Sequence, residues 1–336
     1  MRLGLGISED LPLAQQQVLA RDVEEAGLAS LWTNEASGRD ALMLCQAWAA
    51  ATTTLEVGVG IVPVWTRTPA QLAMAAATLQ EASSGRFLLG LGVSHPATMA
   101  TWHGASYRQP LAAARETLTL LRAILAGERT DHGGEVVSST RFQLAIDSLP
   151  PPPRLYLAAM GPRMLALAGG WADGVLLNWS SPAGIRRAAA AVRGAAAGSG
   201  AGRPPALVEL AAYVRVAIDA DRDAAREALA REMYRYLRLP AYARHLRRQG
   251  LQEEVEEVER AHRDGGPKAA VAAVPEGMLQ QLGWYGTPDD SPVAPLGRYV
   301  TAGLDHLVAR VVVVGDDPAA SVRAVIGALR DLPLSP

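Results

Sequence analysis

Two sites in the sequence carry side chains that commonly transfer protons. Glu35 ends one apolar run, and Ser94 and His95 end another. A carboxylate or an imidazole beside a reacting centre can act as a general acid or base. Glu35 could equally pair with Arg39 or cap the next helix, and a lone histidine is more often structural than catalytic. We take Glu35 and His95 as candidates for catalysis, and both of them with Ser94 as candidates for contact with a cofactor.

Aromatic and polar side chains follow other apolar runs and could line a substrate pocket. The candidates are Trp65, Tyr107, Asn178 and Trp179, although Trp179 could also be a core residue. Arg67 lies two positions after Trp65 and could bind an acidic part of a cofactor or simply anchor its loop. We predict a small-molecule site built from these segments.

A predicted helix start offers a site for an anion. Gly161 and Pro162 open this helix, and proline suits its first turn because no partner is needed for the missing N–H. Free backbone N–H groups there can bind a phosphate, and Arg163 could add charge. Ordinary capping with a surface arginine is the alternative. We predict cofactor contacts from Ala159 and Met160 through Arg163, without excluding that alternative.

The sequence gives no indication of a metal site. Cys45 is the single cysteine, and it lies in the apolar segment 41–51, which has helical periodicity. We therefore expect a buried structural thiol there. No two histidines have the spacing of a metal-binding pair such as His-x-x-x-His. We predict that the protein holds no metal.

The elements that must position these residues follow an alternating pattern. Eight runs rich in Val, Ile and Leu are apolar on consecutive positions, which is typical of strands covered on both faces. Helical stretches separate them, so we predict a parallel sheet. Eight strands predict a closed α/β fold, the (β/α)8 or TIM barrel. The runs are 3–8, 30–35, 55–62, 87–94, 155–160, 174–179, 207–218 and 306–314, and the helices between them include 13–26, 70–82, 111–126 and 164–172.

We expect residues 1–336 to form a single barrel domain with two interruptions. Segment 127–153 is interpreted as a long loop, with or without a small hairpin. Segment 221–295 follows the seventh strand and reads as a helical insertion, either a substrate lid or a peripheral, dimer-forming excursion. The Ala/Gly-rich segment 188–202 is interpreted as a helix followed by a flexible turn.

Composition excludes several classes of protein. Hydrophobic residues make up 49% and charged residues 20%, which is a globular balance rather than that of a disordered chain. A formal net charge of −2 argues against a nucleic-acid partner. No apolar run is long enough to span a bilayer, and the first residues lack the pattern of a signal peptide. We therefore expect a cytoplasmic protein with a small-molecule substrate and with neither a nucleic acid nor a membrane as partner.

Three segments together resemble a known family. They are GIVPVWTRTP at 60–69, SGRFLLGLGVSHP at 84–96 and LYLAAMGPRM at 155–164, supported by LWTNE at 31–35 and GTP at 286–288. In this order they resemble the luciferase-like monooxygenase superfamily, and most closely its coenzyme F420-dependent oxidoreductases of the methylenetetrahydromethanopterin reductase type. The resemblance covers nearly the whole chain.

The resemblance implies where the cofactor would lie. Family members bind the deazaflavin F420 at the C-terminal mouth of the barrel. They carry a non-prolyl cis peptide, which would fall at Gly60-Ile61 here and press against the central ring. Family members often have a histidine after the acid at the second strand; here Ala36 follows Glu35, so that histidine cannot be carried over.

The implied activity is hydride transfer between the deazaflavin C5 and a small organic substrate. Reduction of a C=N or C=C bond, or oxidation of an alcohol, would suit, with His95, Glu35 or water supplying the proton. One alternative is an FMN-dependent monooxygenase of the same superfamily, because the fold hosts both chemistries. A second alternative is a barrel that binds a flavin or deazaflavin without turnover. The family likeness also implies a homodimer.

Overall fold

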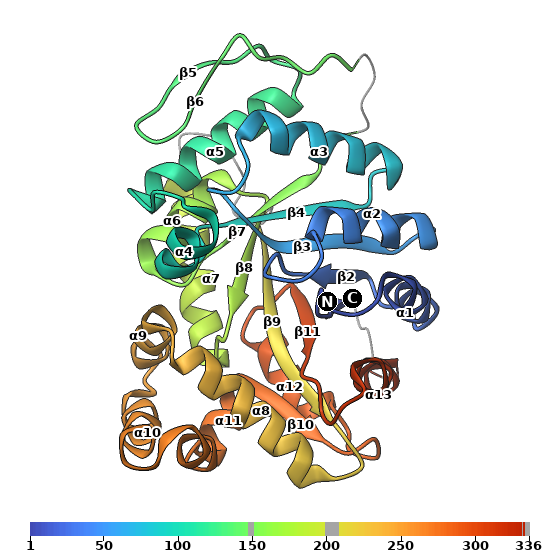
Figure 1. Ribbon diagram of the computed structural model, residues 1–336, viewed down its shortest axis with the longest axis vertical. Helices are drawn as coiled ribbons and strands as arrows, with labels where there is room; N and C mark the ends of the chain where they lie inside the picture. The colour runs from blue at the N-terminus through green and yellow to red at the C-terminus, as the bar shows by residue number, and fades with distance from the viewer. Residues whose placement is uncertain (147–150, 199–207, 331, 333–336) are drawn as a thin grey trace.

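The computed structural model describes residues 1–146, 151–198, 208–330 and 332. Within this part of the chain, eight parallel strands close into a barrel, because the two strands at the ends of their order, β8 and β9, also pair with each other. The predicted (β/α)8 barrel is confirmed, and Figure 1 shows helices packed around it. The barrel strands are β1 (Arg2–Gly6), β2 (Ser30–Thr33), β3 (Glu56–Pro63), β4 (Phe87–Gly92), β7 (Arg154–Ala158), β8 (Gly174–Asn178), β9 (Glu209–Ile218) and β11 (His306–Val311).

Helices surround the barrel, and several of them begin with a side-chain cap. Asp40 accepts hydrogen bonds from the backbone of Leu42 at 2.9 Å and Met43 at 3.1 Å, and Thr68 accepts one from Gln71 at 3.2 Å. Such caps satisfy N–H groups that have no partner in the first turn. These helices are α1 (Leu13–Glu25), α2 (Ala41–Ala51), α3 (Pro69–Ala82), α4 (Pro96–His103), α5 (Pro110–Leu125), α6 (Pro162–Trp171), α7 (Pro182–Gly198), α12 (Val293–Thr301) and α13 (Pro318–Arg330).

The apolar core lies between the strands and the helices, and a second cluster fills the barrel. Trp32, Tyr156, Leu176 and Tyr213 are buried in that inner cluster. Close strand packing depends on glycine at Gly90, where an added Cβ would lie 2.2 Å from a backbone oxygen of the neighbouring strand.

A bulge interrupts strand β3 at the point that the resemblance indicated. The register with β4 shifts between Val59 and Val62. The Gly60-Ile61 peptide bond lies inside that shift and is cis, so this prediction is confirmed.

The described part of segment 127–153 contains the small hairpin that we expected. Strands β5 (Asp131–Gly133) and β6 (Ser138–Thr140) pair antiparallel. The turn is held by Glu116 of α5, whose carboxylate accepts hydrogen bonds from the backbone of Glu135 and Val137, among others, at 2.8–3.0 Å. Although burial opposes ionisation, these backbone bonds hold the pKa of Glu116 below its usual value.

The insertion is helical, as predicted, but it ends in a strand that the sequence pattern did not indicate. Strand β10 (Gly283–Gly286) pairs parallel with the outer half of β9. The insertion helices α8 (Arg222–Leu237), α9 (Pro240–Arg248), α10 (Gln252–Ala272) and α11 (Glu276–Leu282) enclose their own apolar cluster. Figure 1 shows them grouped on one side of the barrel.

Two further expectations concern the Ala/Gly-rich segment 188–202 and membrane-spanning helices. Helix α7 covers the first part of the Ala/Gly-rich segment 188–202, and the expected flexible turn lies outside the described residues. Across the helices of the described ranges, none is both long and apolar enough to cross a membrane.

Candidate active site at the barrel mouth

The predicted site residues gather at one end of the barrel. The carboxyl ends of parallel strands share one end, so residues that directly follow them meet there. Glu35 follows β2, the segment from Trp65 follows β3, His95 follows β4 and Asn178 ends β8. The sequence positions thus converge on one mouth, as a barrel active site requires.

Glu35 and Arg67 form an ion pair at this mouth. Arg67 lies 2.5 Å from Glu35 Oε1 with one nitrogen and 2.6 Å from Asp40 Oδ2 with another. Although burial opposes the charged form, these carboxylates hold the pKa of Arg67 above its usual value. Arg39, the other partner that the sequence allowed for Glu35, instead donates to the backbone oxygen of Asp10 at 2.7 Å.

Within the described residues, the second carboxylate oxygen of Glu35 has no hydrogen-bond partner. Glu35 Oε2 is buried, and the amide oxygen of Asn34, the preceding residue, is also buried without a hydrogen-bond partner. Buried polar atoms are nearly always hydrogen-bonded in proteins. These two oxygens therefore mark a place where a ligand with N–H or O–H groups would complete the structure.

His95 lies between strand β4 and the insertion. Its ring lies 5.6 Å from the ring of Tyr242 in α9. Burial lowers the pKa of His95, so the imidazole is neutral near pH 7. Ser94 has a left-handed backbone with φ 54°, and its carbonyl lies 3.5 Å from the hydroxyl of Tyr107. A neutral imidazole at the mouth can accept a proton or donate its own N–H.

A cavity of about 790 Å³ opens beside the loop that follows β3. That loop, the side chains of Ser106, Arg108 and Gln109, and the turn of the β5–β6 hairpin line it, whereas His95 does not. Trp65 packs on Tyr107 with ring centres 5.1 Å apart, and its indole N–H donates to Val93 at 2.8 Å. The size suits a small organic molecule. Trp65 lines this cavity, whereas Tyr107 does not line it and packs against the ring of Trp65.

The structure adds a cluster that our sequence reasoning missed. The guanidinium of Arg215 lies 4.3 Å from the ring centre of Trp179 and 5.0 Å from that of Tyr236. It donates a hydrogen bond to Asn178, whose amide nitrogen donates to the hydroxyl of Tyr242 at 2.7 Å. Trp179 is 1% exposed, which favours the core role over a substrate-lining role. This cluster joins helices α8 and α9 to the ends of β8 and β9.

Two arginines of adjacent strands bring positive charge to the mouth without a matching acid. Arg215 in β9 and Arg310 in β11 are in register, and both lie near the ring of Tyr213. Among the described residues neither forms an ion pair with a carboxylate, and Arg215 Nε and Arg310 Nη1 are buried without a hydrogen-bond partner. Burying an unpaired charge is costly. The mouth is therefore suited to an anionic ligand. Arginine inside an otherwise apolar strand was the available sequence signal.

The segment after β7 forms the predicted helix start. Gly161 precedes α6, whose first turn has no side-chain cap. Arg163 is exposed, Met160 packs against the insertion, and Ala159 is buried, so Ala159 can contact a ligand only through its backbone. The uncapped N–H groups leave the helix start available to an anion.

His245 anchors α9 against this end of the barrel. It is buried, lies 3.5 Å from Ser180 Oγ, and its ring N–H can donate to the backbone carbonyls around Asn178. Burial and the nearby charge of Arg248 lower its pKa to about 4. Folded His245 therefore stays neutral at a pH where the unfolded chain is already protonated.

This depressed pKa predicts a loss of stability in acid. The unfolded state binds the proton first, so the free energy of unfolding should fall as pH drops from about 6.5 to about 4, by on the order of 3 kcal/mol for this group. Replacing His245 by glutamine should flatten that part of the curve, as measured by urea unfolding at a series of pH values. An unchanged slope in the variant would show that His245 does not carry the effect.

The described residues contain no group of three or more His, Cys, Asp or Glu side chains that could hold a metal ion. Cys45 is buried, and burial raises the pKa of its thiol, as expected for a structural cysteine. The absence of a metal from the protein stays a prediction.

Comparison with known proteins gives consistent matches along the chain. A family model described as luciferase-like monooxygenase matches residues 2–306. The 5,10-methylenetetrahydromethanopterin reductase of Methanolobus tindarius is 30% identical over 313 residues, covering 92% of this chain and 94% of that one. The Archaeoglobus fulgidus protein of the same name is 27% identical over 97% of each chain. The solved coenzyme F420-dependent tetrahydromethanopterin reductase from Methanopyrus kandleri superposes with a TM-score of 0.81 at 25% identity, over 97% of this chain and 98% of that one.

Proposed function

Because the chain belongs to the luciferase-like monooxygenase family, we propose that it is a coenzyme F420-dependent oxidoreductase acting on a small organic substrate. The observation that carries this proposal is the similarity to methylenetetrahydromethanopterin reductases along nearly the whole chain. The reaction is reduction of a C=N or C=C bond, or the reverse oxidation of an alcohol. Bound F420 supplies or accepts the hydride at C5 of its ring.

The residues at the mouth fit such a cofactor. Among the residues that the structure describes, Glu35 Oε2 and Arg310 Nη1 are buried without hydrogen-bond partners, and a polar ring would offer them hydrogen bonds. The cofactor is an anion, which suits the unpaired Arg310 and the uncapped start of α6 at Gly161. Arg67 is already neutralised by two carboxylates, so we assign it to holding Glu35 in place more than to binding the anion.

The proton that accompanies the hydride is held at the mouth. His95 is neutral near pH 7, so its ring can take the hydroxyl proton during alcohol oxidation; in the reverse reduction the imidazolium, formed by taking a proton from water, returns that proton to the product. Glu35 Oε2 is a second position for that proton. Ser94, with its left-handed backbone, shapes the loop that carries His95. Gly60 and Ile61 form the bulge of strand β3.

Helices α8 and α9 act as the cover that keeps water from the reaction. Tyr236 and Tyr242 reach from these helices to Trp179 and His95 at the barrel mouth. Excluding water strengthens the electrostatic contacts of a bound ligand and prevents side reactions with water during hydride transfer. The substrate enters through the cavity beside Trp65.

A titration of the purified protein with coenzyme F420 and, separately, with FMN tests the cofactor. We expect quenching of F420 fluorescence with a Kd at least tenfold lower than that for FMN. Preference for FMN together with oxygen uptake would indicate a monooxygenase instead. Binding of F420 without turnover of any imine, enone or alcohol would support a binding protein, and binding of neither cofactor would refute the proposed function.

We also propose that the protein is a cytoplasmic homodimer, as the family likeness implies. Size-exclusion chromatography with light scattering measures the oligomeric state directly. A mass of 35.4 kDa in solution, the mass of one chain, would contradict the dimer.

A further inference from the structure

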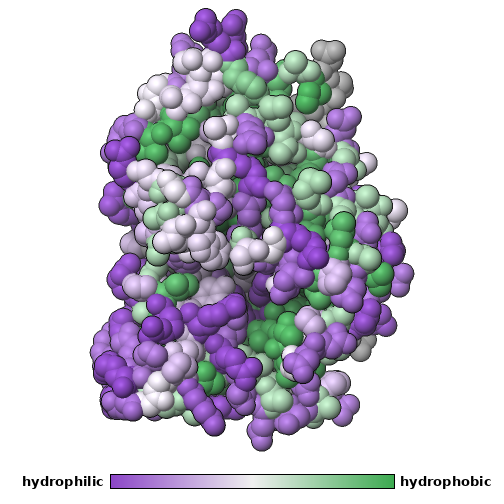
Figure 2. All heavy atoms as spheres, in the orientation of Figure 1, coloured by the Kyte–Doolittle hydropathy of each residue, from purple (hydrophilic) through white to green (hydrophobic). Residues whose placement is uncertain are grey.

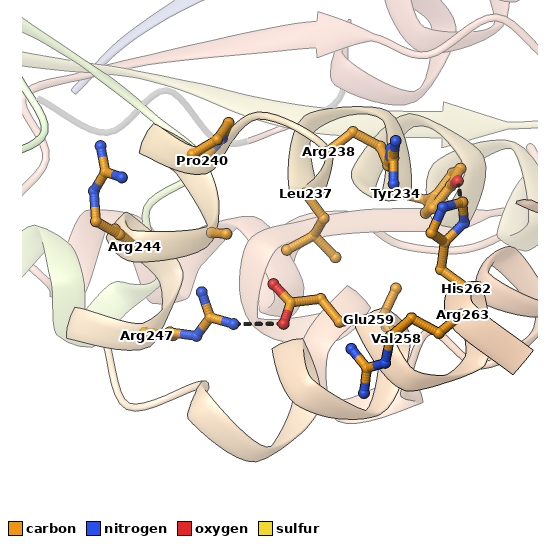
Figure 3. Close-up of a pocket in the computed structure, with 11 residues that line it drawn as sticks. Tyr234, Leu237, Arg238, Pro240, Arg244, Arg247, Val258, Glu259, His262 and Arg263 are labelled. Carbon is orange, nitrogen blue, oxygen red and sulfur yellow. Dashed lines mark hydrogen bonds and ion pairs between the residues drawn. The ribbon is translucent and has the colours of Figure 1, made fainter.

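A second cavity, of about 360 Å³, lies within the insertion between helices α8, α9 and α10 (Figure 3). Its lining residues include no residue of the barrel-mouth loops. Leu237, Ala243 and Val258 give it an apolar base. Figure 2 shows that the same side of the molecule, at the lower left, is largely hydrophilic at its surface.

The side chains around this cavity carry an excess of positive charge. Arg238, Arg244, Arg247 and Arg263 line it, and Glu259 is the one carboxylate among the lining residues. That carboxylate is already paired with Arg247 at 2.6 Å, as Figure 3 shows. The other three arginines have no ion pair within the described ranges of the chain.

Helix α10 carries several acidic residues, but Glu259 is the one carboxylate among the residues that line the cavity, and helix α9 has none. Helix α9, Pro240–Arg248, contains three arginines and no acidic residue, although the whole chain has a net charge of −2. The unpaired arginines are exposed at the rim of the cavity. Like charges around one cavity repel each other, and an anion bound between them relieves that repulsion. Positive charge is therefore in excess among the residues that line this cavity.

We propose that this cavity binds a compact organic polyanion that carries two or more phosphate or carboxylate groups. Guanidinium groups bind both kinds of oxyanion through paired hydrogen bonds, and a volume near 360 Å³ suits a small molecule and excludes a nucleic-acid duplex. Tyr234 and His262, whose hydroxyl and Nδ1 lie 2.9 Å apart at one end of the cavity, supply further polar contacts.

Ligand binding here links three helices that otherwise meet through their apolar cluster. Arg238 comes from α8, Arg244 from α9 and Arg263 from α10. A polyanion between them ties these helices together, so it raises the unfolding temperature of the folded chain by mass action. Tyr236 and Tyr242 of the barrel mouth lie on the same two helices, α8 and α9, with ring centres 4.7 Å apart, so the site adjoins the proposed cover.

Isothermal titration calorimetry on the full chain without cofactor tests the site. The probes are inorganic pyrophosphate and citrate, with acetate and sodium chloride at matched ionic strength as monovalent controls. We expect one binding event with a Kd at least tenfold lower for one or both polyanions than for acetate. Pyrophosphate alone would identify phosphate as the ligand group, and citrate alone would identify carboxylate.

Matched variants locate the binding event. Arg244→Gln and Arg263→Gln each remove one charge-assisted contact and should raise the Kd about tenfold to a hundredfold. Arg260→Gln is the control, because Arg260 is exposed on the same helix as Arg263 but does not line the cavity. Its Kd should stay within about twofold.

Two results would overturn the site. Polyanions that bind no more tightly than acetate would exclude it. So would an Arg260→Gln effect as large as that of Arg244→Gln, because binding would then follow total charge and not this cavity. Circular dichroism of each variant checks that the helices remain folded, and the result does not depend on F420 binding.

Discussion

Replacing Arg310 by glutamine is expected to raise the Kd for coenzyme F420 by about tenfold to a hundredfold. Hydrogen bonds to charged groups contribute about 1.5–3 kcal/mol, and each 1.4 kcal/mol is a factor of ten in affinity. Arg310 lies at the end of β11, half-buried, with a nitrogen that lacks a hydrogen-bond partner. Fluorescence titration of the wild type and the variant with F420 measures the change.

The same substitution should leave the fold intact, which separates a binding role from a structural one. Arg310 has no carboxylate partner among the described residues, so its removal leaves no unpaired acid behind. Removing a half-buried charge that has no carboxylate partner relieves part of its desolvation cost. We therefore expect an unfolding temperature equal to or above that of the wild type.

Two further variants complete this test. Arg310→Lys keeps the charge but loses the planar fork, so it should recover part of the affinity. Arg323→Gln removes an exposed arginine of α13 that pairs with Asp22, and it should not change F420 binding. Wild-type affinity in Arg310→Gln would contradict the assignment of Arg310 to the anionic cofactor.

The barrel could be predicted from sequence because its signal is local. Each buried strand is a short run of consecutive apolar residues, and eight such runs alternate with helices. Strand β10 escaped this reasoning, because Gly283–Gly286 has only four residues and includes two glycines. Its pairing with β9 is decided by the position of the insertion, which no local pattern encodes.

The site was predicted in part for the same reason. Glu35 and His95 directly follow strands, so their place at the mouth follows from the fold. The identity of the partner of Glu35 does not follow from the fold. Arg67 lies 32 positions from Glu35 in the sequence, whereas Arg39 lies only four positions away. Arg215 was also missed, since its inward direction depends on the register of β9 with its neighbours.

Replacing Gly90 by alanine should destabilise the barrel more than any other substitution considered for this protein. The added Cβ would lie 2.2 Å from the carbonyl oxygen of Val59 and 3.3 Å from Cα of Gly60. Both atoms belong to the backbone of the neighbouring strand β3, so no side-chain rotation can relieve the clash. Overpacking of a core typically costs 1–3 kcal/mol, and we expect about 3 kcal/mol or more where the backbone itself must move.

The matched control for this change is Gly194→Ala. Gly194 lies in helix α7, and nothing lies within 4 Å of an added Cβ there. Alanine is favoured over glycine inside a helix by about 1 kcal/mol, so the same chemical change should stabilise the chain slightly. Urea unfolding of both variants beside the wild type gives the two free energies. Equal effects of the two substitutions would refute the close contact between β3 and β4. A loss confined to Gly90→Ala would place that contact, directly under the bulge at Gly60-Ile61, among the features that hold the mouth in shape.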